Sequence, residues 1–262
     1  TGSLENLALA LLTFGNLAVL RGEFDRAEKA FEEGLARLRQ TGKYSHIPHL
    51  LTGLGTVAFE KREVDRSRSL YVEALQLARE FSLKVRETIL LNNLAETARE
   101  AGDIVGARTL FEQSLHNARD LGLSAITAHV LKNRATIARI EVSRVLARTL
   151  LAESLLLYQQ LVVQRLVNVY TAECVLEVAA YSVTEEAWEE AAQLLGASEA
   201  ILVETRGVFG RYERQKQQRL EHAIRSHCLA ERFEANWCEG RGMPAADAIA
   251  YALESLSMPD EH

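Results

Sequence analysis

Apolar residues recur along most of the chain at spacings of three and four, which is the spacing of one face of an α-helix. A first stripe contains Leu7, Leu11, Phe14 and Ala18, and a second contains Ala27, Phe31, Leu35 and Leu38. Arg21-Gly22-Glu23 lies between them and has the composition of a turn, and Asp25 is suited to cap the second helix. The pattern predicts two antiparallel helices joined by a tight turn.

The same pattern returns every 40 residues. Small residues occupy the column Gly15, Gly55, Ala95 and Ala135, and leucines precede it at Leu11, Leu51, Leu91 and Leu131. Large apolar residues follow at Phe31, Tyr71, Phe111 and Leu151. Aligned columns across four units indicate an internal repeat, which decides the fold.

The small column has a physical cause, because two antiparallel helices approach closely only where their side chains are small. We expect Gly15 and Ala27 to meet at this crossing and Phe31 to fill the gap towards the next unit. A single helical hairpin cannot bury both faces, so the hairpins are expected to stack. Gly42 and Gly122 are suited to left-handed caps at the ends of second helices.

The fourth and fifth units depart from the pattern. Arg134 stands in an otherwise apolar column, and Val142 replaces the turn glycine, so no tight turn is expected there. A fifth unit begins near Thr171, four residues out of phase, with an acidic loop at 185–190. Beyond Gly207 the repeat stops.

The segment after Gly207 is expected to cap the open end of the array. Its apolar residues predict one long helix, with the positions Leu220, Ile224, Cys228, Leu229, Phe233 and Trp237. Gly240 to Pro244 breaks the pattern, and a last helix is expected from Ala245 to Leu256.

The columns resemble those of the tetratricopeptide repeat (TPR), and the first unit fits best, at Leu11, Phe14, Gly15, Ala18, Gly22, Phe24, Ala27 and Phe31. The usual TPR period is about 34 residues, whereas HEAT-type repeats have periods near 40. The glycine, alanine and aromatic columns favour TPR. The resemblance implies an all-α, right-handed superhelical solenoid. The expected hairpins are at about 8–47, 48–87, 88–127, 128–171 and 172–206, followed by capping helices at 207–262.

A narrower resemblance rests on four segments, which are Ala191 to Ala200, Arg211-Tyr212-Glu213, Phe233 to Arg241 and Ala248 to Leu253. Together with 40-residue TPR units, they resemble the C-terminal region of bacterial LuxR-type and STAND-class transcriptional regulators. The resemblance implies a sensor or interaction arm. The ATPase and DNA-binding domains of such a regulator would lie outside this chain.

Composition narrows the class of protein. The chain of 262 residues is 48% apolar and 25% charged, with only three prolines, which disfavours an all-β fold. The net charge of −6 argues against direct nucleic-acid binding, and no apolar stretch reaches the ~18 residues needed to cross a membrane. Three scattered cysteines indicate a reducing, cytoplasmic compartment. The opening Thr1-Gly2-Ser3 lacks a methionine, so we expect a fragment that carries vector residues.

No catalytic constellation is evident, so an enzyme is not expected. The segment Gly53-Leu54-Gly55-Thr56-Val57-Ala58 matches G-x-G-x-x-A, but no strand precedes it, and no phosphate-binding G-x-x-x-x-G-K-[ST] loop is present. The set His222, His227, Cys228 and Cys238 lacks the close pairs of a zinc site. We therefore expect no metal and no cofactor.

One basic patch stands out between residues 128 and 150, and it contains Lys132, Arg134, Arg139, Arg144 and Arg148. It is interpreted as a solvated face that balances the acidic fifth unit. An acidic partner or an intramolecular contact is the alternative.

In TPR arrays the first helices line a concave groove. The groove positions here are Asn16, Thr52, Thr56, Asn92, Asn93, Glu96, Arg99, Lys132, Asn133, Thr136 and Arg139. Amides offer donors and acceptors, which suit an extended peptide or a small polar ligand; an ordinary hydrated helix face is the alternative. Only Lys132 with Asn133 resembles the carboxylate clamp of co-chaperone TPRs, which disfavours that function.

The favoured hypothesis is a non-catalytic protein-interaction or ligand-sensing region of a bacterial signalling and transcriptional regulator. A free-standing TPR scaffold or peptide receptor is the second hypothesis. An enzyme that binds a small ligand in the groove is the third.

Overall fold

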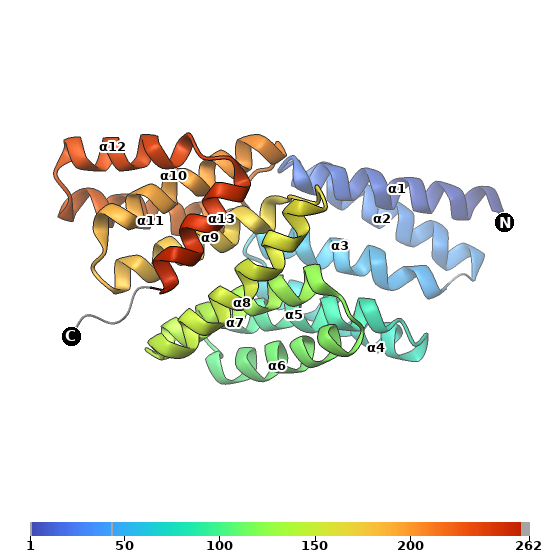
Figure 1. The fold of residues 1–262 in the computed structure, drawn as a ribbon. Coiled ribbons are helices and arrows are strands. Elements are labelled where there is room, and N and C mark those ends of the chain that lie inside the picture. The colour runs from blue at the N-terminus through green and yellow to red at the C-terminus, as the bar shows by residue number, and fades with distance from the viewer. Residues whose placement is uncertain (1, 43, 258–262) are drawn as a thin grey trace. The chain divides into compact units, whose positions relative to one another are not determined.

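The computed structural model describes residues 2–42 and 44–257, which form thirteen α-helices and one 3₁₀ turn and contain no strand (Figure 1). The last residues of the expected cap, 258–262, lie outside the described residues. The chain divides into two compact units, residues 1–123 and 124–262. The limits of the five repeats and the start of the capping helices at residue 207 stay predictions from periodicity.

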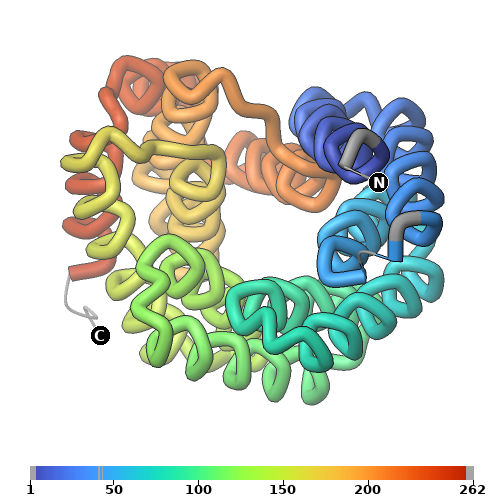
Figure 2. Tube along the Cα trace, turned by 90° about the vertical axis from the view of Figure 1, so that its right-hand side faces the viewer, coloured from blue at the N-terminus to red at the C-terminus, as the bar shows by residue number. Residues whose placement is uncertain are grey.

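The first unit contains three hairpins. Its helices are α1 (Gly2–Leu20), α2 (Phe24–Thr41), α3 (Ile47–Glu60), α4 (Val64–Glu80), α5 (Lys84–Glu100) and α6 (Ile104–Asp120), with the 3₁₀ turn η1 (Tyr44–His46) before α3. Each odd-numbered helix packs along the next helix, and α2 and α4 also contact the following hairpin. The succession of hairpins can be followed by colour in Figure 2.

The small and aromatic columns account for this packing. Phe31 is completely buried, and its ring lies against Gly15 of α1 and Gly53 of α3, so that a methyl group at either glycine would overlap the ring. Tyr71 of α4 lies against Gly55 of α3 in the same way. The predicted role of Phe31 between successive hairpins is therefore confirmed.

The turns are more uniform than the sequence indicates. Gly22, Gly42, Gly102 and Gly122 all have positive φ, as expected for left-handed turns and caps. Val142 also adopts φ 58°, and the amide of Ser143 bonds to Ala138 O at 2.8 Å, as Asp103 N bonds to Ala98 O at 2.9 Å. The expected loss of the tight turn in the fourth unit was wrong, because the flanking helices hold valine in this strained conformation.

The cap expected at Asp25 was also wrong. Helix α2 already begins at Phe24, and Glu23 occupies the N-cap position without a side-chain hydrogen bond. Asp25 lies in the first turn, where its carboxylate pairs with Lys61 at 2.6 Å.

The second unit contains two more hairpins and three further helices. They are α7 (Ser124–Ile140), α8 (Arg144–Val163), α9 (Val169–Thr184), α10 (Trp188–Thr205), α11 (Arg211–His227), α12 (Ala230–Arg241) and α13 (Ala245–Ser257). Helix α12 packs along α10, α13 contacts α8 and α10, and α11 contacts α9 and α10.

The long helix expected after Gly207 is in fact two helices. Cys228 adopts an extended conformation, with φ −99° and ψ 146°, and so does Leu229, so the chain turns between α11 and α12. Ile224 and Phe233 are buried, as expected from the stripe, but Leu229 is largely exposed. The turn lets α12 return along α10, which a continuous helix could not do.

Candidate functional site

The expected groove residues of the first unit lie on α1, α3 and α5. Asn16 is exposed, whereas Thr52 and Asn92 are buried. Four residues are partly exposed, and these are Thr56, Asn93, Glu96 and Arg99. The partly exposed residues of α3 and α5 therefore form the accessible part of the expected groove face, which we call the α3–α5 polar face.

Hydrogen bonds within the α3–α5 polar face are long on α5. The amide nitrogen Nδ2 of Asn92 lies 3.4 Å from Asn93 Oδ1 and 3.4 Å from Glu96 Oε2. On α3, the Thr56 hydroxyl bonds to Thr52 O and lies 3.1 Å from the Tyr71 hydroxyl. Hydrogen bonds near 3.4 Å are weak.

The expected groove residues of the second unit are mostly enclosed. Lys132, Asn133 and Thr136 are buried on α7. The Lys132 ammonium lies 2.9 Å from Glu173 Oε2 on α9 and 3.9 Å from Glu213 Oε1 on α11. The Asn133 amide lies 3.3 Å from His129 Nε2. These side chains therefore already have partners within their own unit.

A second set of buried charges surrounds Glu177 of α9. Its carboxylate accepts from Lys216 Nζ of α11 at 2.6 Å and from Arg139 Nε of α7 at 3.0 Å. Burial by itself raises the pKa of Glu177, but the two cations outweigh burial and lower that pKa to about 2. The network joins three helices of the second unit through fully charged groups.

Several members of this network were missed by the sequence reasoning, namely Glu173, Glu177, Glu213 and Lys216. A signal was present in the sequence, because Glu173 and Glu177 interrupt the otherwise apolar run 172–180, which the structure buries. Charged residues at such positions are almost always paired. Their partners on α11 could not be read from spacing, since the two helices are far apart along the chain.

The basic patch is divided among intramolecular contacts. Lys132 and Arg139 belong to the buried network, and Arg144 pairs with Glu185 of the acidic loop at 3.3 Å. The alternative of an intramolecular contact is thus confirmed for these three residues.

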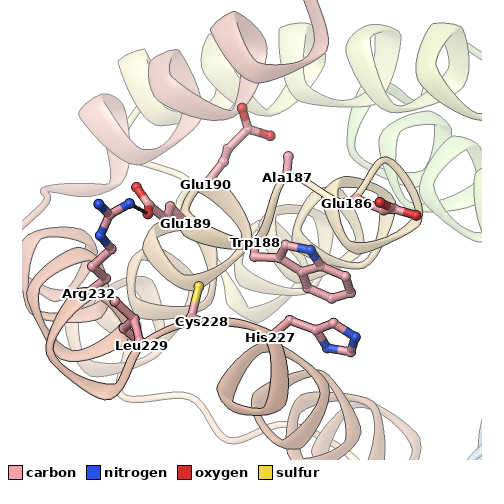
Figure 3. A pocket seen from close by; sticks show the side chains of 9 residues that line it. All are labelled: Glu186, Ala187, Trp188, Glu189, Glu190, His227, Cys228, Leu229 and Arg232. Carbon is pink, nitrogen blue, oxygen red and sulfur yellow. Dashed lines mark hydrogen bonds and ion pairs between the residues drawn. The ribbon is translucent and has the colours of Figure 1, made fainter.

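A surface pocket of about 490 Å³ lies where α10 begins and α11 gives way to α12 (Figure 3). The rings of Trp188 and His227 stack at 4.0 Å between centroids, and Arg232 pairs with Glu189 at 2.5 Å. Burial and the Glu189 carboxylate raise the pKa of Cys228, which keeps its thiol protonated and poorly reactive. The pocket therefore contains no activated nucleophile.

The motif residues have structural roles. Gly53, Gly55 and Ala58 lie inside α3, against aromatic rings or in the core, and not in a loop that could hold a phosphate. His227 and Cys228 line the pocket. Within residues 2–42 and 44–257, no group of three histidine, cysteine, aspartate or glutamate side chains is placed to hold a metal ion. None of the helices in these ranges is both long and apolar enough to span a bilayer.

These features define the chain as a TPR-like helical repeat. The solved structure of BtubC (BKLC) from P. vanneervenii is similar, with a TM-score of 0.61 and 17% identity over 79% of this chain and 84% of that chain. A Rap protein complexed with Competence and Sporulation Factor is also similar, with a TM-score of 0.58 and 15% identity over 94% of this chain and 73% of that chain. No family model and no curated protein matches the sequence. At these identities the likeness concerns the fold.

Proposed function

We propose that this chain is a non-catalytic interaction module whose partner, a protein segment or peptide, lies along the α3–α5 polar face. The main support is a contrast between the hydrogen bonds of the polar side chains on α5 in the first unit and the ion pairs in the second unit. The buried Asn92 amide lies 3.4 Å from each of the partly exposed Asn93 and Glu96 side chains, whereas Lys132 and Lys216 make buried ion pairs of 2.9 and 2.6 Å. A ligand gains more by replacing weak, accessible hydrogen bonds than by breaking buried charge pairs.

The chemistry of the α3–α5 polar face fits a polypeptide backbone. Asn93 offers both a donor and an acceptor, and Thr56 offers a hydroxyl. Glu96 and Arg99 add one charge of each sign, so neither a strongly acidic nor a strongly basic ligand is required. The Rap protein of the comparison is complexed with a factor, which shows that a chain with a similar fold can hold a ligand.

The test uses a photo-crosslinking amino acid at position 93, with position 113 on the exposed side of α6 as the matched control. In the native host we expect one partner to crosslink from position 93 and not from position 113. Asn93→Ala should then weaken binding of that partner by about 1–3 kcal/mol, and Gln113→Ala should leave it unchanged. Equal crosslinking from both positions, or unchanged affinity of a folded Asn93→Ala variant, would refute the proposed face.

The wider proposal is that the module is the sensing arm of a LuxR-type or STAND-class bacterial regulator that acts in the cytoplasm. It is supported by the segments that resemble those regulators, two of which contain Gly196 and Gly240. The sequence of the complete polypeptide tests it. An ATPase core and a helix-turn-helix segment are expected on the same polypeptide, and their absence would favour a free-standing scaffold or peptide receptor.

A further inference from the structure

Arg86 of α5 is a partly buried cation without a partner among the described residues. Its Nε is buried and makes no hydrogen bond, and none of the ion pairs between these residues includes its guanidinium. Burial lowers the pKa of Arg86. Arg86 also lies in the first turn of α5, where the helix macrodipole disfavours a positive charge. A positive charge is therefore left uncompensated at this end of α5.

The carboxylate next to Arg86 along the chain is already bound by other cations. Glu87 Oε1 accepts a hydrogen bond from Arg79 Nε at 2.8 Å, and Glu87 Oε2 lies 3.2 Å from Lys84 Nζ. Both oxygens of Glu87 are thus engaged, so this carboxylate does not compensate Arg86.

The 40-residue repeat shows which group is missing beside Arg86. In the preceding repeat the counterpart of Arg86 is His46, and His46 Nε2 lies 3.6 Å from Glu5 Oε1. The counterpart of Glu5 beside Arg86 is Ser45. A carboxylate in the first repeat is therefore replaced in the second by a hydroxyl, which can donate a hydrogen bond to an anion.

His49 of α3 is a second group without its full set of partners. Helix α3 contacts α5, and His49 Nδ1 is buried without a hydrogen-bond partner among the described residues. Burial, and then the positive charges of Arg86 and His46, lower the pKa of His49 to about 4. His49 is therefore neutral at pH 7, and a negative charge beside Arg86 would favour its protonation.

His49 and Arg86 lie at the N-terminal end of the α3–α5 polar face. His49 precedes Thr56 by seven residues, and Arg86 precedes Asn93 by seven residues. Seven residues are two helical turns, so each pair lies on one side of its helix. The two groups are therefore on the same side as the α3–α5 polar face but outside the part of it described above.

We propose that Ser45, His49 and Arg86 form a binding site for a doubly charged oxyanion, of the chemical class of a phosphate group. The guanidinium can pair with two oxygens, and the Ser45 hydroxyl and the protonated His49 ring can donate to the anion. A double charge offsets both Arg86 and a protonated His49, whereas a carboxylate offsets only one of them. The tests use small anions alone, so they succeed or fail independently of the partner proposed for the α3–α5 polar face.

Calorimetric titration with sulfate at low ionic strength is the first test, because sulfate is a doubly charged oxyanion. Arg86→Gln should weaken sulfate binding by about tenfold or more, since the charge-assisted hydrogen bonds are lost. Arg68→Gln, at an exposed arginine of α4, is the matched control and should bind sulfate normally. Arg86→Gln should also unfold at an unchanged or higher temperature, because no internal partner is lost. A purely structural role of Arg86 would lower that temperature.

Ser45→Glu tests the comparison between the two repeats. The new carboxylate would occupy the position that Glu5 has beside His46, and would therefore compensate Arg86 from within the chain. We expect sulfate binding to be lost and the unfolding temperature to be kept or raised. Ser45→Gln has a similar size without the charge, and it should retain sulfate binding.

The pH dependence of sulfate binding tests the role of His49. Sulfate keeps its double charge between pH 7 and pH 5, whereas binding should raise the pKa of His49 and add a proton to its ring. The affinity should therefore rise as the pH falls over this range. His49→Gln should remove this rise, and His46→Gln, at the histidine that faces Glu5, should retain it. The opposite pattern in these two variants would contradict the role given to His49.

A comparison of inorganic phosphate with O-phosphoserine identifies the source of the anion. Tighter binding of phosphoserine would assign the site to a phosphorylated partner, and tighter binding of inorganic phosphate would assign it to the free ion; the site stands in both cases. Three outcomes would overturn the proposal. They are the absence of measurable sulfate binding, binding that Arg86→Gln or Ser45→Glu leaves unchanged, and acetate binding as tight as that of sulfate.

Discussion

At the scale of single residues, the neighbouring side chains decide whether a buried titratable group is charged or neutral. Glu177 is completely buried and is nevertheless ionised, because Lys216 and Arg139 hold its carboxylate. Cys174, buried on the same helix, has a pKa raised to about 12 and stays a neutral thiol. Burial favours the neutral form of both groups, and at Glu177 two hydrogen-bonded cations outweigh it.

The first prediction concerns acid stability. The folded pKa of Glu177 is about 2, below its ordinary value of 4.5, so its contribution is complete above pH 4.5 and is lost as the pH falls towards 2. We expect the free energy of unfolding to fall by a few kcal/mol over this range. Glu177→Gln should lower stability at pH 7 by about 3–5 kcal/mol, because it leaves Lys216 and Arg139 without their shared partner. Urea unfolding at several pH values measures both effects.

The exposed Glu254 of α13 supplies the control for this measurement. Glu254→Gln should change neither the stability at pH 7 nor its dependence on acid by more than about 0.5 kcal/mol. An acid dependence that is the same in Glu177→Gln and in the unchanged chain would contradict the role given to Glu177.

At the scale of elements, helices α10 and α12 cross with their backbones in contact. The backbones meet at two glycines, because a Cβ on Gly196 would overlap the carbonyl of Trp237 and a Cβ on Gly240 would overlap the carbonyl of Gln193. The segments around Gly196 and Gly240 therefore have a packing function in the second unit.

The second prediction follows from this crossing. Gly240→Ala should lower the free energy of unfolding by about 1–3 kcal/mol or more, since backbone atoms cannot move aside as side chains do. Gly242→Ala, two residues further on, is the matched control, because Gly242 has a negative φ of −82° and its nearest contact to an added Cβ is 3.3 Å. Thermal unfolding of the two variants measures this difference. Equal stability of the two variants would mean that α10 and α12 can separate slightly without a loss in the free energy of unfolding.

At the scale of the whole molecule, the three C-terminal helices complete the second unit. Helices α12 and α13 cover α10, whose residues Leu194, Leu195 and Ile201 are fully buried. Helix α11 supplies Lys216 to the buried network. These helices therefore bury apolar residues of the second unit and also supply a charge to its buried network. The sequence predicted only that they cover the open end of the array.

The third prediction is that truncation after Gly207 destabilises the second unit and promotes association. The truncated chain exposes the apolar residues of α10 and leaves Glu177 with Arg139 alone. We expect oligomers or aggregates by light scattering and a lower unfolding temperature. A chain that ends at Ser257 retains α13 and should behave as the full chain does. A monodisperse truncate of unchanged stability would show that α11–α13 do not complete the unit.

Much of the helical architecture followed from the sequence alone. The pairing of helices and the filling role of Phe31 depend on residues at short, regular separations, and an internal repeat shows such separations several times over. The 40-residue period also identified which faces of α1 and α3 are equivalent. These properties are local, so spacing and side-chain size suffice to determine them.

Only the tertiary structure decided which of the equivalent faces are open. Asn93 and Asn133 occupy the same column of the repeat, but Asn93 is partly exposed and Asn133 is buried. Helices α9 and α11 supply the carboxylates that pair with Lys132, the residue next to Asn133. Leu17 and Val57 share another column, and Leu17 is 46% exposed whereas Val57 is fully buried. Periodicity shows which way a side chain points along its own helix, whereas burial depends on helices that come from elsewhere in the chain.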